Sequence, residues 1–132
     1  MSWRYMLDTD SVSYALRGQG NVAAHILQHR PSELCISAIT LAELRFGASK
    51  RDSRKLQRLI DTFAESVTPL AFDTDAADSF GKLAADLANR GTPIGAFDAM
   101  IAAHAVSQKL VLVSNNTKHF SRVTGLRCEN WL

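Results

Sequence analysis

Residues 3–10 read Trp3-Arg4-Tyr5-Met6-Leu7-Asp8-Thr9-Asp10, a short apolar run with aromatic content that ends in acids. A run of this kind predicts a strand buried on both faces of a sheet. In an open α/β sheet, ligands bind outside the carboxyl ends of the strands, near the point where the strand order reverses. Asp8 therefore occupies the position expected of a functional acid, and this position favours function over the alternative that Asp8 simply caps the following helix.

Outward from this stretch, strand-like and helical segments alternate. We expect further strands at 34–39, 67–72, 110–114 and 126–129, and helices at 11–17, 22–29, 40–48, 52–64, 74–89 and 97–108. Pro69 inside the third strand points to an edge position or a strand end. The alternation predicts an α/β fold with three layers (α/β/α) and a central, mainly parallel sheet of four to five strands.

The length and composition of the chain are those of a single domain with one hydrophobic core. The 132 residues fit a single domain, with 46% apolar and 21% charged residues and no apolar run long enough to span a membrane. The N-terminus lacks the pattern of an export signal, so we expect a cytoplasmic protein. Cys35 and Cys128 have no Cys or His at metal-site spacing and are interpreted as small buried hydrophobes.

Two further acids accompany Asp8. Glu43 lies in Thr40-Leu41-Ala42-Glu43, which matches a capping box, but it shares a helical face with Ile39, Phe46 and Gly47, which favours an inward position. Asp98 lies in the first turn of an almost entirely apolar helix, where the helix dipole alone would favour an acid. A carboxylate on a buried helix is costly unless it is paired or binds a metal.

Together the three acids suit Mg²⁺ or Mn²⁺, which prefer oxygen ligands and retain water. The sequence contains no Cys/His set that would select zinc. Such a centre can generate hydroxide from bound water and neutralise charge on a phosphodiester.

Four stretches match one family in order: Tyr5-Met6-Leu7-Asp8-Thr9-Asp10, the segment 35–48 around Glu43, the segment 91–102 around Asp98, and Leu112-Val113-Ser114-Asn115-Asn116-Thr117. The closing segment 120–131 fits as well. With these stretches the chain resembles the PIN-domain family and, within it, the enteric-type VapC toxins of type II toxin–antitoxin systems, over essentially its whole length. The resemblance implies a single PIN domain over residues 1–132.

The resemblance also implies an activity and partners. It implies a metal-dependent endoribonuclease, with Mg²⁺ or Mn²⁺ bound by acids that match Asp8, Glu43 and Asp98. Its substrate would be tRNA or another structured RNA, with the anticodon loop of the initiator tRNA as one candidate, and its action would inhibit translation. It further implies a homodimer and a cognate VapB antitoxin, whose C-terminal segment enters the active-site groove and through which alone the complex contacts operator DNA.

One position departs from the broader family, in which a fourth acid usually follows the fourth strand. Asn116 stands there, as it tends to in the enteric-type subgroup. An Asn side chain adds no negative charge, so we expect one firmly held ion on Asp8 and Asp98. Glu43 would contact that ion through water or orient the nucleophile.

Other polar residues have weaker assignments. Thr9, Ser114 and Asn116 are candidates for water-mediated contacts to the metal or the phosphate, with a simple helix cap as the alternative for Thr9. Asp10 would lie near Asp8 in an extended chain but point outward in a turn. We interpret His104 as a core histidine and His119 as a surface loop residue.

A basic stretch accompanies these candidates. It is either an RNA-binding face or an ordinary solvated helix surface, with Arg45 best placed near Glu43; its members are Arg45, Lys50, Arg51, Arg54, Lys55 and Arg58.

Three alternatives stay open at this point. Asp8-Thr9-Asp10 at a strand end mimics a haloacid-dehalogenase-like phosphotransferase, but Ser114-Asn115-Asn116 supplies none of the later acids that such an enzyme needs. A catalytically dead interaction module would not require all three acids. A nuclease acting on other RNA or on DNA is the third, because no residue pattern reads a 2′-hydroxyl.

Overall fold

The computed structural model describes residues 3–132, so residues 1 and 2 of the expected domain lie outside the described part. Its elements, in chain order, are β1 (Tyr5–Leu7), α1 (Thr9–Leu16), α2 (Val22–Leu27), η1 (Pro31–Glu33), β2 (Leu34–Ser37), α3 (Ala38–Lys50), α4 (Arg54–Ser66), β3 (Thr68–Leu70), α5 (Thr74–Asn89), α6 (Ala96–Ser107), β4 (Val111–Val113), α7 (Thr117–Phe120) and β5 (Arg127–Glu129).

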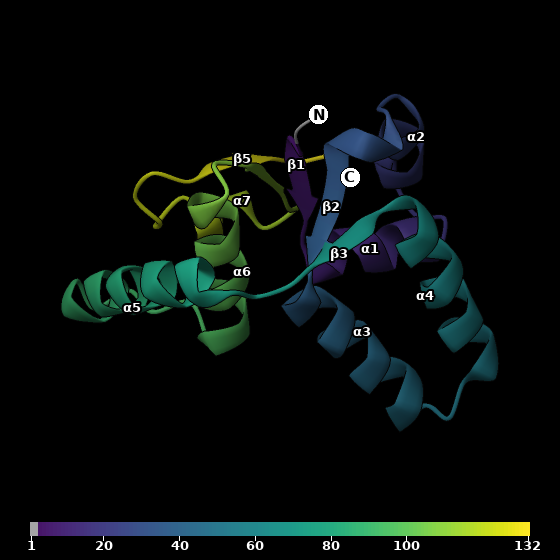
Figure 1. Cartoon of the computed structure of the whole chain (residues 1–132), viewed down its shortest axis with the longest axis horizontal. Helices are drawn as coiled ribbons and strands as arrows, with labels where there is room; N and C mark the ends of the chain where they lie inside the picture. Colours follow the sequence, from purple (N-terminus) through teal and green to yellow (C-terminus); the bar gives the residue numbers. More distant parts are fainter. Residues whose placement is uncertain (1–2) are drawn as a thin grey trace.

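The five strands form one parallel sheet in the order β3-β2-β1-β4-β5 (Figure 1). This confirms the predicted α/β class and the parallel sheet. The strand β3 lies at an edge, as Pro69 indicated, because a proline cannot donate a hydrogen bond to a neighbour on its second side. The strand order reverses between β1 and β4, where the Asp8 N–H donates to the carbonyl oxygen of Val113 at 2.9 Å.

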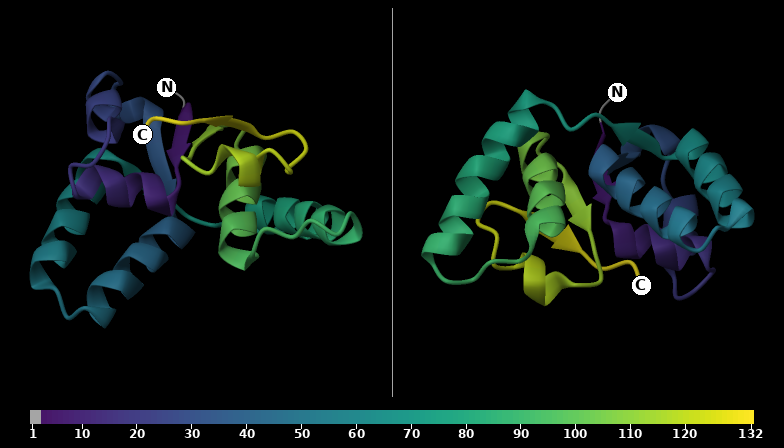
Figure 2. Two further views of the ribbon diagram at one scale, coloured as in Figure 1. Left: turned by 180° about the vertical axis from the view of Figure 1, so that it is seen from behind. Right: turned by 90° about the horizontal axis from the view of Figure 1, so that it is seen from below.

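Side-chain alternation along the strands divides the interior into two cores. Tyr5, Leu7 and Ile36 pack with residues of α1 to α4, whereas Met6 and Cys35 pack with residues of α5, α6 and α7. The two views of Figure 2 show the corresponding helix groups on opposite sides of the strands. The predicted three-layer arrangement follows from this period of two residues.

The helix α6 crosses the second core and is buried nearly throughout, as its apolar composition predicted. Its His104 is fully buried and its Nδ1 lies 2.8 Å from the Ser37 Oγ, while its ring meets the edge of Phe72. Burial lowers the pKa of His104. The interpretation of His104 as a core histidine is confirmed.

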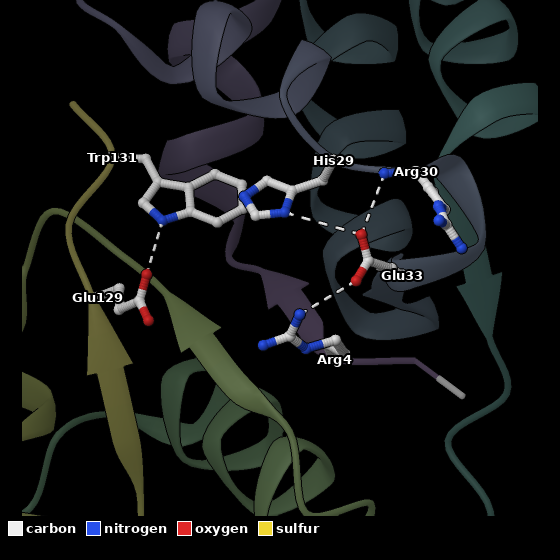
Figure 3. Close-up of polar contacts among 6 residues, drawn as sticks. All are labelled: Arg4, His29, Arg30, Glu33, Glu129 and Trp131. Atoms are coloured by element: carbon white, nitrogen blue, oxygen red, sulfur yellow. Dashed lines mark hydrogen bonds and ion pairs between the residues drawn. The ribbon is translucent and has the colours of Figure 1, made fainter. Parts of the chain in front are cut away.

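The chain closes over the other end of the sheet through aromatic stacking. The Trp131 indole stacks on the imidazole of His29 at 4.9 Å with the rings 4° from parallel, and its Nε1–H donates to the Glu129 carboxylate at 3.0 Å (Figure 3). Glu33 connects the same region to Arg4 at 3.2 Å. The Arg4–Glu33 contact lies at the amino ends of β1 and β2, whereas Glu129 ends β5 in register with Val113 of β4.

Cys35 is buried and Cys128 is half-buried, and neither forms a disulfide. Burial raises the pKa of the Cys35 thiol to about 12 and that of Cys128 to about 11, so both behave as inert apolar groups. None of the helices in residues 3–132 is long and apolar enough to cross a lipid bilayer.

Candidate active site at the carboxyl edge of the sheet

Asp8 follows β1 directly at the point where the strand order reverses. Its Oδ1 accepts a hydrogen bond from the Ser11 N–H at 2.8 Å, so the alternative assignment as the N-cap of α1 is confirmed. The side chain is only 4% exposed. Desolvation raises its pKa to about 6, against the lowering effect of hydrogen bonds from Ser114 and Ser11. An acid held so far from water is unusual for a simple cap and fits a cation site.

Glu43 does not belong to a capping box. The helix α3 begins at Ala38, where Ser37 caps it by accepting from the Ile39 N–H at 3.1 Å, so Glu43 lies well inside the helix. Its Oε1 instead accepts a hydrogen bond from the Thr9 Oγ1 at 2.6 Å, which joins α3 to the start of α1. The capping-box alternative is wrong because the helix starts two residues earlier than the sequence indicated.

Asp98 lies in the first turn of α6 and keeps 40% of its side chain exposed. It is therefore less buried than the apolar helix suggested. Its Oδ2 lies 3.4 Å from the His119 Nε2, and that nitrogen also lies 2.8 Å from the Ile94 carbonyl oxygen. His119 is thus a half-buried partner of Asp98, and its interpretation as a surface loop residue is wrong.

Burial and neighbouring negative charges shift the pKa values of these carboxyl groups. Burial is the main cause of the raised pKa of Glu43 and of Asp98, and nearby negative charge adds to it. Asp98 raises the pKa of Glu43, while Asp10 raises that of Asp8, Glu43 and Asp98. Asp10, exposed in the first turn of α1, is therefore a fourth charge near this group.

The fold brings these acids to the same edge of the sheet but does not arrange them as a complete set of metal ligands. Within residues 3–132, no three His, Cys, Asp or Glu side chains lie close enough together to hold a metal ion as they stand. Mg²⁺ does not demand such a cage, because it keeps several waters and is commonly bound by one or two carboxylates together with substrate phosphates. The donors are all oxygens, and within residues 3–132 no Lys or Arg forms an ion pair with Asp8, Glu43 or Asp98. Their chemistry therefore fits a hard divalent ion.

The residues after β4 complete the edge. Ser114 is fully buried, and its Oγ accepts the Asn116 N–H at 3.0 Å. Asn116 precedes α7, and its side chain is exposed and makes no capping bond. Ser114 thus lies beside Asp8, to which its side chain hydrogen-bonds, and Asn116 follows two residues later at the same edge.

Arg45 lies apart from the carboxylates. Two residues after Glu43, it points to a different side of α3, where its guanidinium binds Gln57 Oε1 at 2.8 Å and Asp61 Oδ1 at 2.6 Å on α4. It holds the α3–α4 hairpin together. The other cations of the basic stretch are exposed on that hairpin: Lys50, Arg51, Arg54, Lys55 and Arg58.

A parallel sheet with a strand-order reversal and acids at its carboxyl edge defines an open α/β domain whose ligand site lies at that edge. The sequence profile of the PIN domain matches residues 5–126. The chain belongs to the PIN-domain family. Within that family its relatives are VapC ribonucleases, as the resemblance implied.

Two relatives and one solved structure illustrate this. The chain is 38% identical over 130 residues to the tRNA(fMet)-specific endonuclease VapC of Salmonella typhimurium, covering 97% of this chain and 98% of the relative. Ribonuclease VapC2 of Haemophilus influenzae is also 38% identical, over 98% of both chains. The structure of DNA-bound VapBC from Salmonella typhimurium matches with a TM-score of 0.89 and 37% identity, covering 98% of this chain and 99% of that chain.

Proposed function

We propose that this chain is the toxin of a VapBC-type toxin–antitoxin pair and an endoribonuclease that hydrolyses a phosphodiester bond of tRNA. The observation that carries the proposal is the desolvated carboxyl group of Asp8 at the strand-order reversal, with Asp98 close enough to Glu43 to raise the pKa of Glu43. Relatives covering nearly the whole chain are VapC endonucleases, one of them specific for tRNA(fMet).

Mg²⁺ or Mn²⁺ would be held by Asp8 and Asp98, with Glu43 contacting it through water. When bound, the ion would supply a nucleophilic hydroxide at neutral pH and neutralise charge on the phosphate. Thr9 fixes the Glu43 carboxylate by donating to Oε1, and Ser11 and Ser114 fix Asp8. The contact with His119 lowers the pKa of Asp98 against the effect of burial. We assign Asn116 to water-mediated contact with the substrate or metal.

The proposed partners follow from the relatives. Solved neighbours are VapBC complexes, including DNA-bound ones, so we assign a VapB-type antitoxin to this chain and operator contact to that antitoxin. We further propose that residues 1–132 act as one domain, that the chain forms a homodimer, and that it works in the cytoplasm. We assign Arg45 an indirect part in RNA binding, because its bonds to Gln57 and Asp61 connect the two helices on which the exposed cations lie.

The proposal is tested by inducible expression of the chain, alone and together with its antitoxin, followed by mapping of tRNA ends. We expect growth arrest and new tRNA ends with the chain alone, and neither with the antitoxin present. Asp8→Ala and Asp98→Ala should abolish both effects. Arrest that persists in both variants without new tRNA ends would contradict a ribonuclease and favour an interaction module that lacks catalysis.

A further inference from the structure

Two phenylalanine rings project into solvent beside the acids. Phe46 is 68% exposed and Phe97 is 56% exposed. Phe46 lies on α3, three residues after Glu43 and so on the same side of that helix, and Phe97 immediately precedes Asp98 on α6. Leaving two aromatic rings in water forgoes the free energy of burying them, and this cost is incurred next to the candidate catalytic groups.

The two rings line a single pocket. It has a volume of about 420 Å³, and its other lining residues are Thr9, Ala42 and Glu43. The two aromatic walls thus come from two different helices, α3 and α6, while Glu43 and its hydrogen-bond partner Thr9 on α1 connect the pocket to the carboxylates. A ligand bound in this pocket would therefore lie next to the phosphodiester bond that the carboxylates are proposed to cleave.

We propose that Phe46 and Phe97 bind an unpaired nucleobase of the RNA, adjacent to the scissile phosphate. This inference rests on the proposed function and deepens it by naming the form of RNA that the site accepts. A nucleobase offers flat π faces to aromatic rings, and stacking on such rings is the usual way in which proteins hold unpaired bases. A base within a duplex is already stacked and paired, so it would not be available to the rings.

The charges around the pocket favour a nucleic acid over an apolar peptide segment. The Lys50 Nζ lies 6.0 Å from the centre of the Phe46 ring. A second cleft shares Thr9 and Glu43 with the aromatic pocket and carries Arg17 and Arg51 on its lining. Cations close to an aromatic pocket match a chain that alternates bases with phosphates.

Selectivity follows from this arrangement. Stacking tolerates every base, so the phenylalanine pocket would select loops and single-stranded ends over helices without choosing among sequences. The identity of the preferred tRNA would then be set by contacts elsewhere on the protein.

The test compares aromatic with aliphatic side chains of similar size. Phe46→Leu and Phe97→Leu keep an apolar side chain but cannot stack, whereas Phe46→Tyr and Phe97→Tyr retain the ring. Leu27→Ala, at a position 86% exposed on α2, is the control for loss of an exposed apolar side chain. Cleavage of the initiator tRNA is measured as kcat/KM for the full chain in Mg²⁺, together with oligomeric state by size-exclusion chromatography and affinity for the antitoxin.

We expect each Leu variant to lose roughly five- to hundredfold in kcat/KM, the Tyr variants to stay near wild type and Leu27→Ala to be unchanged. In the inactive Asp98→Asn background, a 2-aminopurine base beside the mapped bond should be quenched on binding, and Phe97→Leu should remove the quenching.

Three results would overturn the inference while leaving the proposed function intact: Leu variants that cleave at the wild-type rate, Leu variants that lose only antitoxin affinity, or Leu variants whose lost activity accompanies a changed oligomeric state. A wild-type chain that cleaves no tRNA would refute the proposed function, and this inference with it.

Discussion

Replacing Asp8 by Asn should stabilise the metal-free protein at neutral pH while removing its activity. The pKa of Asp8 is about 6 in the folded chain, against 3.8 for an unperturbed side chain. The folded state therefore holds this proton more tightly than the unfolded state. The tighter proton binding by Asp8 stabilises the folded state fully below about pH 4, and this stabilisation is lost as the pH rises through 6. Over that range the unfolding free energy falls by roughly 3 kcal/mol. Asn removes the buried charge and keeps an oxygen to accept from the Ser11 N–H.

A stability change of this size can be measured by thermal unfolding. At pH 7.5 with chelator present, we expect Asp8→Asn to raise the unfolding free energy by about 1–3 kcal/mol, which is a rise of roughly 3–10 °C in Tm for a chain of this size. At pH 4 the gain should vanish, because the wild-type carboxyl group is then protonated. Asp78→Asn, at an exposed position on α5, is the matched control and should change Tm little at either pH. Protein concentration is held constant because dimerisation would shift Tm.

An Asp8→Asn variant that is no more stable than wild type at pH 7.5, or equally stabilised at both pH values, would refute the reasoning. Adding Mg²⁺ should then stabilise the wild type more than the variant, because the ion compensates the buried charge.

Further predictions concern the groups around the acids. Thr9→Val removes the hydrogen bond that lowers the pKa of Glu43, so the acid limb of the pH profile of kcat/KM should move to higher pH; an unmoved limb contradicts this role. His119→Ala removes the charge that lowers the pKa of Asp98 and should move the same limb upward, whereas an unchanged profile would show that the 3.4 Å contact has no effect on Asp98. Ser37→Ala removes both the cap of α3 and the partner of His104, and urea unfolding should show a loss of about 1–3 kcal/mol; a loss below 0.5 kcal/mol would be inconsistent with a buried hydrogen bond. Titration with Mn²⁺ in the absence of RNA should give one ion per chain, and two tightly bound ions would contradict the single-ion centre.

The sheet and most helices could be predicted because their signals are local. The run before Asp8 and the run 110–114 are uninterrupted and apolar, which is the pattern of strands buried on both faces, and they form β1 and β4. Pro69 gave the edge position of β3 because proline lacks the N–H that a central strand needs.

The errors arose where a tertiary contact overrides a local pattern. Thr40 and Glu43 have the spacing of a capping box, but Ser37 already caps α3 and Glu43 is paired with Thr9, which is 34 residues away. His119 was missed because nothing near it in sequence is acidic. Its location shortly after β4, at the same edge as Asp8, was the available signal, since parallel strands bring their carboxyl ends together.

The most direct test of the central claim is cleavage of purified initiator tRNA by the purified chain, with product ends mapped in Mg²⁺ and in chelator. A metal-dependent carboxylate centre predicts discrete cleavage in Mg²⁺, none in chelator, and none by Asp98→Asn at the same Mg²⁺ concentration. Equal cleavage by the wild type and Asp98→Asn, or cleavage that persists in chelator, would contradict it.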